Sequence, residues 1–138
     1  MWKEYYYSDC RSVNDVDVTS KELAEYNLLL TGNSETNFII AQIENNLPLR
    51  FLTNSFIHNG ITYNSDNCIF MIHPNPLNPR RYVLVAGAST PSNIIRPSEK
   101  SLFVQNDDFV ILDEKTGNIV NSGRYNQEWQ WSWNECQL

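Results

Sequence analysis

The sequence predicts a small α/β domain, built as a two-layer or three-layer sandwich with a mixed β-sheet, one main helix and β-hairpins. Three observations favour this fold. A strand, a glycine turn and a helix follow one another between residues 27 and 46, apolar strands recur after residue 50, and an Asn-Gly pair joins two of them. A chain of 138 residues fits one domain around one hydrophobic core.

The chain divides into an arm, a core and a tail. The N-terminal arm includes a short helix that Thr19 or Ser20 can cap and that runs through Tyr26. The tail is rich in tryptophan, and an extended segment would place the indoles of Trp129, Trp131 and Trp133 on one face. The predicted boundaries of the three parts are residues 1–26, 27–129 and 130–138.

The first core elements are a strand and the main helix. The apolar run from Leu28 to Leu30 is bounded by Gly32, which is typical of a strand covered on both faces. The helix is predicted from Ser34 to Asn46, because apolar residues recur at four-residue spacing on one face. Pro48 follows, and a proline forces the residue before it out of helical geometry.

Strands and turns dominate the rest of the chain. Asn59-Gly60 between β-forming residues predicts a hairpin, since both turn positions need positive φ. Two central strands are predicted at residues 68–73 and 82–86, and the crossover loop PNPLNPR joins them. A polar excursion over the surface is predicted at residues 89–105. Two further strands are predicted at residues 109–112 and 118–121, on either side of a turn that contains Gly117.

Composition and charge exclude several classes of function. The net charge is −6 and the ten Lys and Arg residues are scattered, so we expect neither nucleic acid nor an anionic membrane as a partner. No apolar run approaches the roughly 20 residues that span a bilayer. The N-terminus has no signal core, and we expect a soluble domain. The compartment stays open, with a secreted parent as one alternative.

Cysteines and histidines give no pattern of a metal site or a cofactor site, and we predict neither. Cys10, Cys68 and Cys136 are far apart and show no CxxC spacing. Structural thiols are the preferred interpretation, and the odd count also permits one disulfide between Cys10 and Cys136. Two histidines without acidic residues at ligand spacing make a poor zinc site.

One segment could hold a ligand, namely the turn from strand to helix, where free N–H groups converge. It lacks the glycine pattern of phosphate-binding loops, and Glu35 would repel a phosphate. A purely structural helix cap is the preferred interpretation of this turn, and a ligand site is the alternative, for which a neutral polar ligand such as a sugar suits better. The residues predicted to bind a ligand are Thr31, Gly32, Asn33, Ser34 and Asn37.

A second candidate surface is the proline-rich loop. Its three prolines fix φ, and its asparagines can close Asx turns, so the loop is predicted to be rigid. It is interpreted either as a stiff crossover between core strands or as a docking surface. The predicted docking residues are Asn75, Asn78, Arg80 and Arg81.

No catalytic residues are predicted. His58 precedes a hairpin turn and is expected to be exposed, whereas His73 is expected to hydrogen-bond the proline-rich loop. General-base catalysis needs an imidazole beside a nucleophile and an orienting acid, and nothing in the sequence places them together. Asp107 and Asp108 are neighbours on a strand, so they point to opposite faces and cannot converge as an acid/base pair.

Two segments carry a resemblance to a known family: NLLLxGxxxxN over residues 27–37 and PNPLNPxRYVxVxxG over residues 74–87. With the late Phe109 strand and the Gly123, Tyr125, Trp129 ending, residues 27–129 resemble the C-terminal accessory domain of bacterial multidomain α/β-hydrolases, which are esterase-like or prolyl-oligopeptidase-like proteins. The resemblance implies a non-catalytic module whose partner domain holds the Ser-Asp-His machinery. Arg124 departs from the pattern, where an aromatic residue is expected, and the arm and tail match less well.

Three functions follow, in order of preference. The first is a non-catalytic binding or assembly module accessory to an esterase-type or peptidase-type hydrolase, with the hydrolase domain or a carbohydrate as partner. The second is a small-molecule or carbohydrate-binding domain that uses the turn from Thr31 to Asn37. The third is a hydrolase in its own right. Assembly into a homo-oligomer is compatible with all three.

Overall fold

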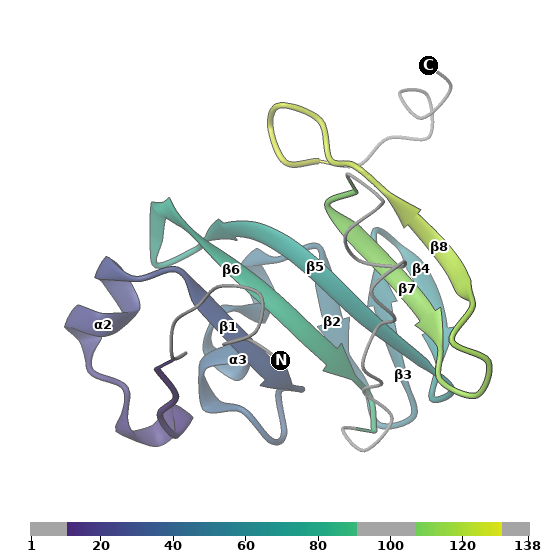
Figure 1. The fold of residues 1–138 in the computed structure, drawn as a ribbon, viewed down its shortest axis with the longest axis horizontal. Helices are drawn as coiled ribbons and strands as arrows, with labels where there is room; N and C mark the ends of the chain where they lie inside the picture. Colours follow the sequence, from purple (N-terminus) through teal and green to yellow (C-terminus); the bar gives the residue numbers. More distant parts are fainter. Residues whose placement is uncertain (1–10, 91–106, 131–138) are drawn as a thin grey trace.

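Figure 1 shows the computed structural model of the chain, which describes residues 11–90 and 107–130. Strands hold 44% of these residues and helices 17%, so the protein is mostly β. The mixed sheet and the hairpins are confirmed, whereas helices contribute less than the predicted α/β class implies. The predictions for Cys10, Cys136, Trp131, Trp133 and most of the 89–105 excursion lie outside the described residues.

The large sheet has five strands. β1 runs parallel to β6, and all other neighbours are antiparallel, which makes the sheet mixed. The two strands predicted to be central, β5 and β6, pair with each other inside the sheet. In spatial order the strands are β1 (Leu28–Gly32), β6 (Asn78–Ala88), β5 (Asn67–Asn75), β7 (Phe109–Asp113) and β8 (Ile119–Gly123).

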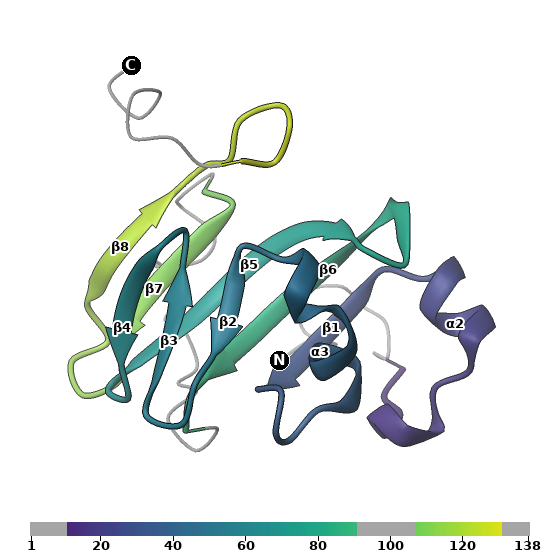
Figure 2. The ribbon, with the colours of Figure 1, turned by 180° about the vertical axis from the view of Figure 1, so that it is seen from behind.

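The small sheet has three antiparallel strands, β2 (Leu49–Phe51), β3 (Ser55–His58) and β4 (Ile61–Asn64). The predicted Asn-Gly hairpin is confirmed, because Asn59 (φ 51°) and Gly60 (φ 80°) both have positive φ between β3 and β4. Figure 2 shows the small sheet lying with α3 across one face of the large sheet. That face is called the inner face below, and the opposite one the outer face.

The main helix is shorter than predicted. α3 spans Phe38–Ile43 and continues as the 3₁₀ turn η2 (Glu44–Asn46), so the predicted end is confirmed. The predicted start at Ser34 is wrong. The Asn37 side chain accepts from the first free N–H groups of α3 and caps it, while the residues before it form a separate turn.

Two short elements form the described part of the arm, η1 (Asp15–Asp17) and α2 (Ser20–Glu25). The predicted α2 is confirmed, and Thr19 is its N-cap. Thr19 accepts from the Glu22 backbone N–H, while the Glu22 carboxylate accepts from the Thr19 backbone N–H, which makes a capping box.

The hydrophobic core lies between the inner face and the layer formed by the small sheet and α3. Burying each large apolar side chain there contributes about 2 kcal/mol. The members with almost no exposed surface include Ile40, Ile43, Phe56, Ile69, Met71, Val83, Val85, Phe109 and Ile111. A second buried cluster on the outer face consists of Cys68, Phe70, Ala86, Ala88, Val110 and Leu112.

β1 is not covered on both faces as predicted. Leu30 is buried in the core, but Leu29 on the outer face is 50% exposed. Among the described strands β1 pairs with β6 alone, so it lies at the edge of the sheet that the described residues form. An unbroken apolar run therefore predicted more burial than an edge strand receives.

The proline-rich link is also different from its prediction. β5 and β6 continue to Asn75 and Asn78 and pair there, so the link is a β-hairpin with Pro76 and Leu77 at its tip, and not a crossover loop. The pairing register shifts at Pro74 and Asn75, where a proline cannot donate to the ladder. The turn between β7 and β8 is as predicted, with Gly117 at φ 70°.

Candidate functional site

The Asn33 side chain builds the turn from strand to helix. It is buried, and its Oδ1 accepts from the backbone N–H groups of Glu35 (3.0 Å) and Thr36 (3.1 Å). Its Nδ2 donates to the carbonyl oxygens of Ala88 (3.2 Å) and Ser89 (2.9 Å) at the end of β6. The amide therefore ties the turn to the neighbouring strand and keeps no free group for a ligand.

Asn37 and Gly32, two of the other predicted ligand residues, also support the fold. Besides capping α3, Asn37 donates from its Nδ2 to the Thr31 carbonyl oxygen (3.1 Å). Gly32 has φ 112°, and a Cβ there would lie 2.5 Å from the Thr36 hydroxyl oxygen. The structure thus brings the five predicted residues into one turn, but only Thr31 and Ser34 keep side chains without a hydrogen bond to another described residue.

Replacing Asn33 by alanine is expected to destabilise the protein by about 2 kcal/mol, because it leaves buried backbone groups of two segments without partners. Urea denaturation of the variant measures this loss. Asn54→Ala, in the exposed turn after β2, is the matched control and should change stability little. Equal stability of the two variants would contradict the structural role of Asn33.

The predicted docking residues divide into two pairs. Asn75 and Asn78 close the hairpin tip, because their Oδ1 atoms accept from Leu77 and Arg80 N–H groups and form the predicted Asx turns. Their Nδ2 atoms donate to carbonyl oxygens at the end of α2. Both amides are thus used to hold α2 against the hairpin, whereas Arg80 and Arg81 are exposed.

His58 is buried, which corrects the prediction that it is exposed. It is 1% exposed, and its Nε2 lies 2.6 Å from the Tyr125 hydroxyl. Its ring also packs against Phe109, with 4.4 Å between the ring centroids. Burial, and then the nearby His73, lower the pKa of His58 to about 3. The imidazole is therefore neutral at neutral pH, and Nε2 accepts the hydrogen bond from the Tyr125 hydroxyl.

The groups around Tyr125 complete this cluster. Burial, and then Asp108, raise the pKa of the Tyr125 phenol, so it stays protonated and can donate to His58. The Asp108 carboxylate accepts from the Tyr125 backbone N–H (2.9 Å). His73 bonds through Nδ1 to the Pro74 carbonyl oxygen (3.0 Å), as predicted for its loop. Both imidazoles are thus bonded to groups other than a serine or cysteine nucleophile.

Sequence reasoning missed an exposed apolar patch on the outer face. It consists of Leu29 on β1 with Tyr82 and Leu84 on β6, which are 50%, 43% and 39% exposed. Leu29 and Leu84 are paired in register, and Tyr82 lies two residues before Leu84 on the same face. Side chains alternate between the two faces along RRYVLVAGA, and this alternation could have indicated the outer face. In β1 the run of three leucines is unbroken, so the sequence does not show which of them point outwards.

Comparison with known proteins finds no match, whether with a protein-family model, a curated protein or a solved structure.

Two negative findings apply to residues 11–90 and 107–130. No three His, Cys, Asp or Glu side chains in these ranges gather closely enough to hold a metal ion. No helix in the same ranges has the length and apolar composition needed to cross a bilayer.

Proposed function

We propose that the chain is a non-catalytic binding module that docks on an esterase-type or peptidase-type hydrolase domain. The observation that carries this proposal is the apolar patch of Leu29, Tyr82 and Leu84. A contiguous patch of exposed apolar side chains often marks the site where a protein partner binds. A tyrosine among them adds to the argument, since tyrosine is enriched in interfaces.

The position of the patch favours a protein partner. It lies on strands that are fixed by the core beneath them, because Val83 and Val85 alternate with Tyr82 and Leu84 and are fully buried. Such a rigid face binds without the cost of ordering a loop. The edge of the sheet at β1 is continuous with the patch and could take part in the same contact.

Two further points support the proposal of a non-catalytic binding module. The imidazoles are bonded to Tyr125 and Pro74, and burial lowers the pKa of His58 to about 3, which makes this imidazole too weak a base to take a proton from a nucleophile near neutral pH. The resemblance of residues 27–129 to accessory domains of hydrolases names the class of partner. On this reading, the hydrolase domain supplies the catalytic residues.

The proposal predicts that the same gene or operon encodes an esterase-type or peptidase-type hydrolase domain, and isothermal titration calorimetry of the chain against that domain tests it. The wild-type chain should form a one-to-one complex. Leu84→Lys should weaken it at least about tenfold, because a charge would then be buried in the interface.

Val120→Lys is the matched control. Val120 is a similarly exposed apolar residue, but it lies on β8 at the opposite edge of the large sheet, so its replacement should leave the affinity unchanged. Thermal melting of both variants checks that the fold is intact. The proposal fails if the wild-type chain forms no complex, if it only associates with itself, or if the two variants bind equally well.

A further inference from the structure

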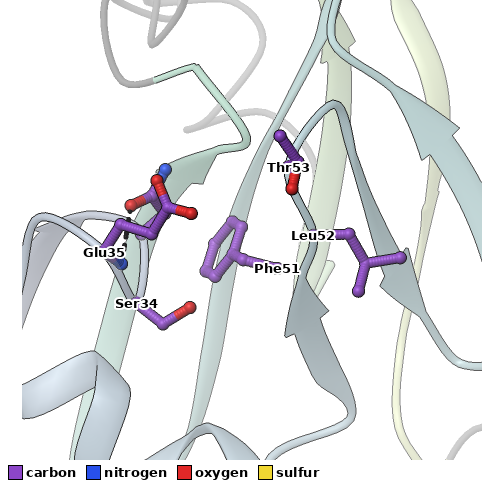
Figure 3. A pocket seen from close by; sticks show the side chains of 6 residues that line it. Ser34, Glu35, Phe51, Leu52 and Thr53 are labelled. Atoms are coloured by element: carbon purple, nitrogen blue, oxygen red, sulfur yellow. Dashed lines mark hydrogen bonds between the residues drawn. The ribbon is translucent and has the colours of Figure 1, made fainter.

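A shallow hollow of about 280 Å³ lies between two turns that belong to different parts of the fold. One wall is the turn from β1 to α3, with Asn33, Ser34 and Glu35, and the other is the turn after β2, with Leu52 and Thr53. Figure 3 shows the Phe51 ring between these two walls. Leu52 and Thr53, which form the second wall, were not predicted from the sequence to bind a ligand.

The groups around the hollow fall into two kinds. Asn33 is committed to the fold, as its four hydrogen bonds to the backbone show. The hydroxyls of Ser34 and Thr53 and the carboxylate of Glu35 make no hydrogen bond to another described residue, and Glu35 and Thr53 are exposed. These three side chains can therefore bond to a ligand without breaking the turn.

The Phe51 ring supplies the apolar part of the hollow. Only 7% of its surface is exposed, so it contributes a small, fixed apolar floor and not a flat platform. Gly87 leaves room for it, because a Cβ there would lie 2.4 Å from the Phe51 Cζ. The ring is therefore held in place before any ligand arrives.

An apolar floor with hydroxyl and carboxylate groups around it suits a ligand that has one apolar face and a hydroxylated edge. A neutral sugar ring has both. The volume lies just below the range of ligand pockets, which begins at about 300 Å³, so it fits no more than a single ring. Glu35 and the net charge of −6 disfavour anionic ligands.

We propose that this hollow binds one neutral sugar residue, with Ser34, Glu35 and Thr53 bonding its hydroxyl groups and Phe51 contacting its apolar face. This site is separate from the apolar patch, and the proposal does not rest on docking to a hydrolase. Because the hollow is small and open, the dissociation constant should be about millimolar.

The test is a set of NMR titrations of the ¹⁵N-labelled chain with the neutral sugars glucose, galactose, mannose and N-acetylglucosamine and with the charged sugars glucuronate and glucosamine, each added singly. At least one neutral sugar should give saturable shifts of the Ser34, Glu35 and Thr53 amides. Thr53→Val and Glu35→Gln should each weaken that binding at least about fivefold, as loss of one hydrogen bond to a ligand predicts.

Matched controls separate a site effect from a general one. Thr62→Val removes a hydroxyl from an exposed threonine of β4, and Glu25→Gln removes an exposed charge from α2, so neither should change the affinity. Leu84→Lys should also bind the sugar normally, even if it abolishes docking. The proposal is overturned if no neutral sugar gives saturable shifts, if only glucuronate or glucosamine does so, or if Thr53→Val binds like the wild type.

Discussion

Lowering the pH from about 7 to about 4.5 is expected to remove about 2–3 kcal/mol of stability through His58 alone. The pKa of this imidazole is about 3 in the folded protein and near the ordinary value of 6.5 in the unfolded chain. Below pH 6.5 the unfolded chain therefore binds a proton that the folded protein does not. The loss is about 1.4 kcal/mol per pH unit and continues until the pH reaches the folded pKa.

A double variant isolates this effect from that of other groups, because carboxylates such as Asp113 and Glu22 also have lowered pKa values and contribute to acid unfolding. Replacing His58 by Leu and Tyr125 by Phe removes both partners of the buried hydrogen bond together, which should cost little at neutral pH. Urea denaturation at several pH values then compares the two proteins. Parallel losses of stability in both would contradict the burial of a neutral His58.

Tyr125→Phe alone should behave differently from the double variant. It leaves Nε2 of His58 buried without its partner, which is expected to destabilise the protein by about 1–3 kcal/mol at neutral pH. Its acid sensitivity should remain, since the imidazole is still present. A single variant as stable as the wild type would mean that the hydrogen bond to Tyr125 contributes nothing.

The second large effect is expected for Gly87→Ala, which should destabilise the fold by about 3 kcal/mol. A Cβ at this position would lie 2.4 Å from the Phe51 Cζ and 2.9 Å from the Gly32 carbonyl oxygen. Gly32 and Gly87 are register partners of β1 and β6, so this oxygen belongs to a paired strand and cannot rotate away. Guanidinium denaturation measures the change.

A second substitution tests the cause. Phe51→Leu combined with Gly87→Ala should recover part of the stability, because it removes the nearer of the two contacts and leaves the backbone contact in place. If Gly87→Ala is as stable as the wild type, or if Phe51→Leu adds its full cost to that of Gly87→Ala, the close packing at this point is wrong.

Local signals in the sequence were sufficient for several elements. The Asn59-Gly60 hairpin was predicted because the turn depends on two adjacent residues that accept positive φ. The start of α3 was not, since Asn33, Ser34 and Asn37 are all suitable caps. The choice among them depends on the bonds of Asn33 to Ala88 and Ser89, which lie 55 and 56 residues away.

The candidate sites were predictable only in part, for the same reason. His58 is buried because Tyr125, 67 residues further along the chain, covers it, and no local pattern reveals this. The polar residues that looked available for ligands, Asn33 and Asn37, are those that the turn needs for itself. The second wall of the hollow comes from the β2 turn, whose sequence, Leu52 and Thr53, has no motif.

Hydrogen–deuterium exchange of the chain, with and without the hydrolase domain proposed as its partner, tests the docking proposal most directly. Residues 28–32 of β1 and 82–86 of β6 should gain protection in the complex, because the apolar patch lies on them. Protection confined to the turn at residues 33–37 or to the hairpin tip at residues 75–81, with β1 unchanged, would contradict docking through the outer face of the sheet.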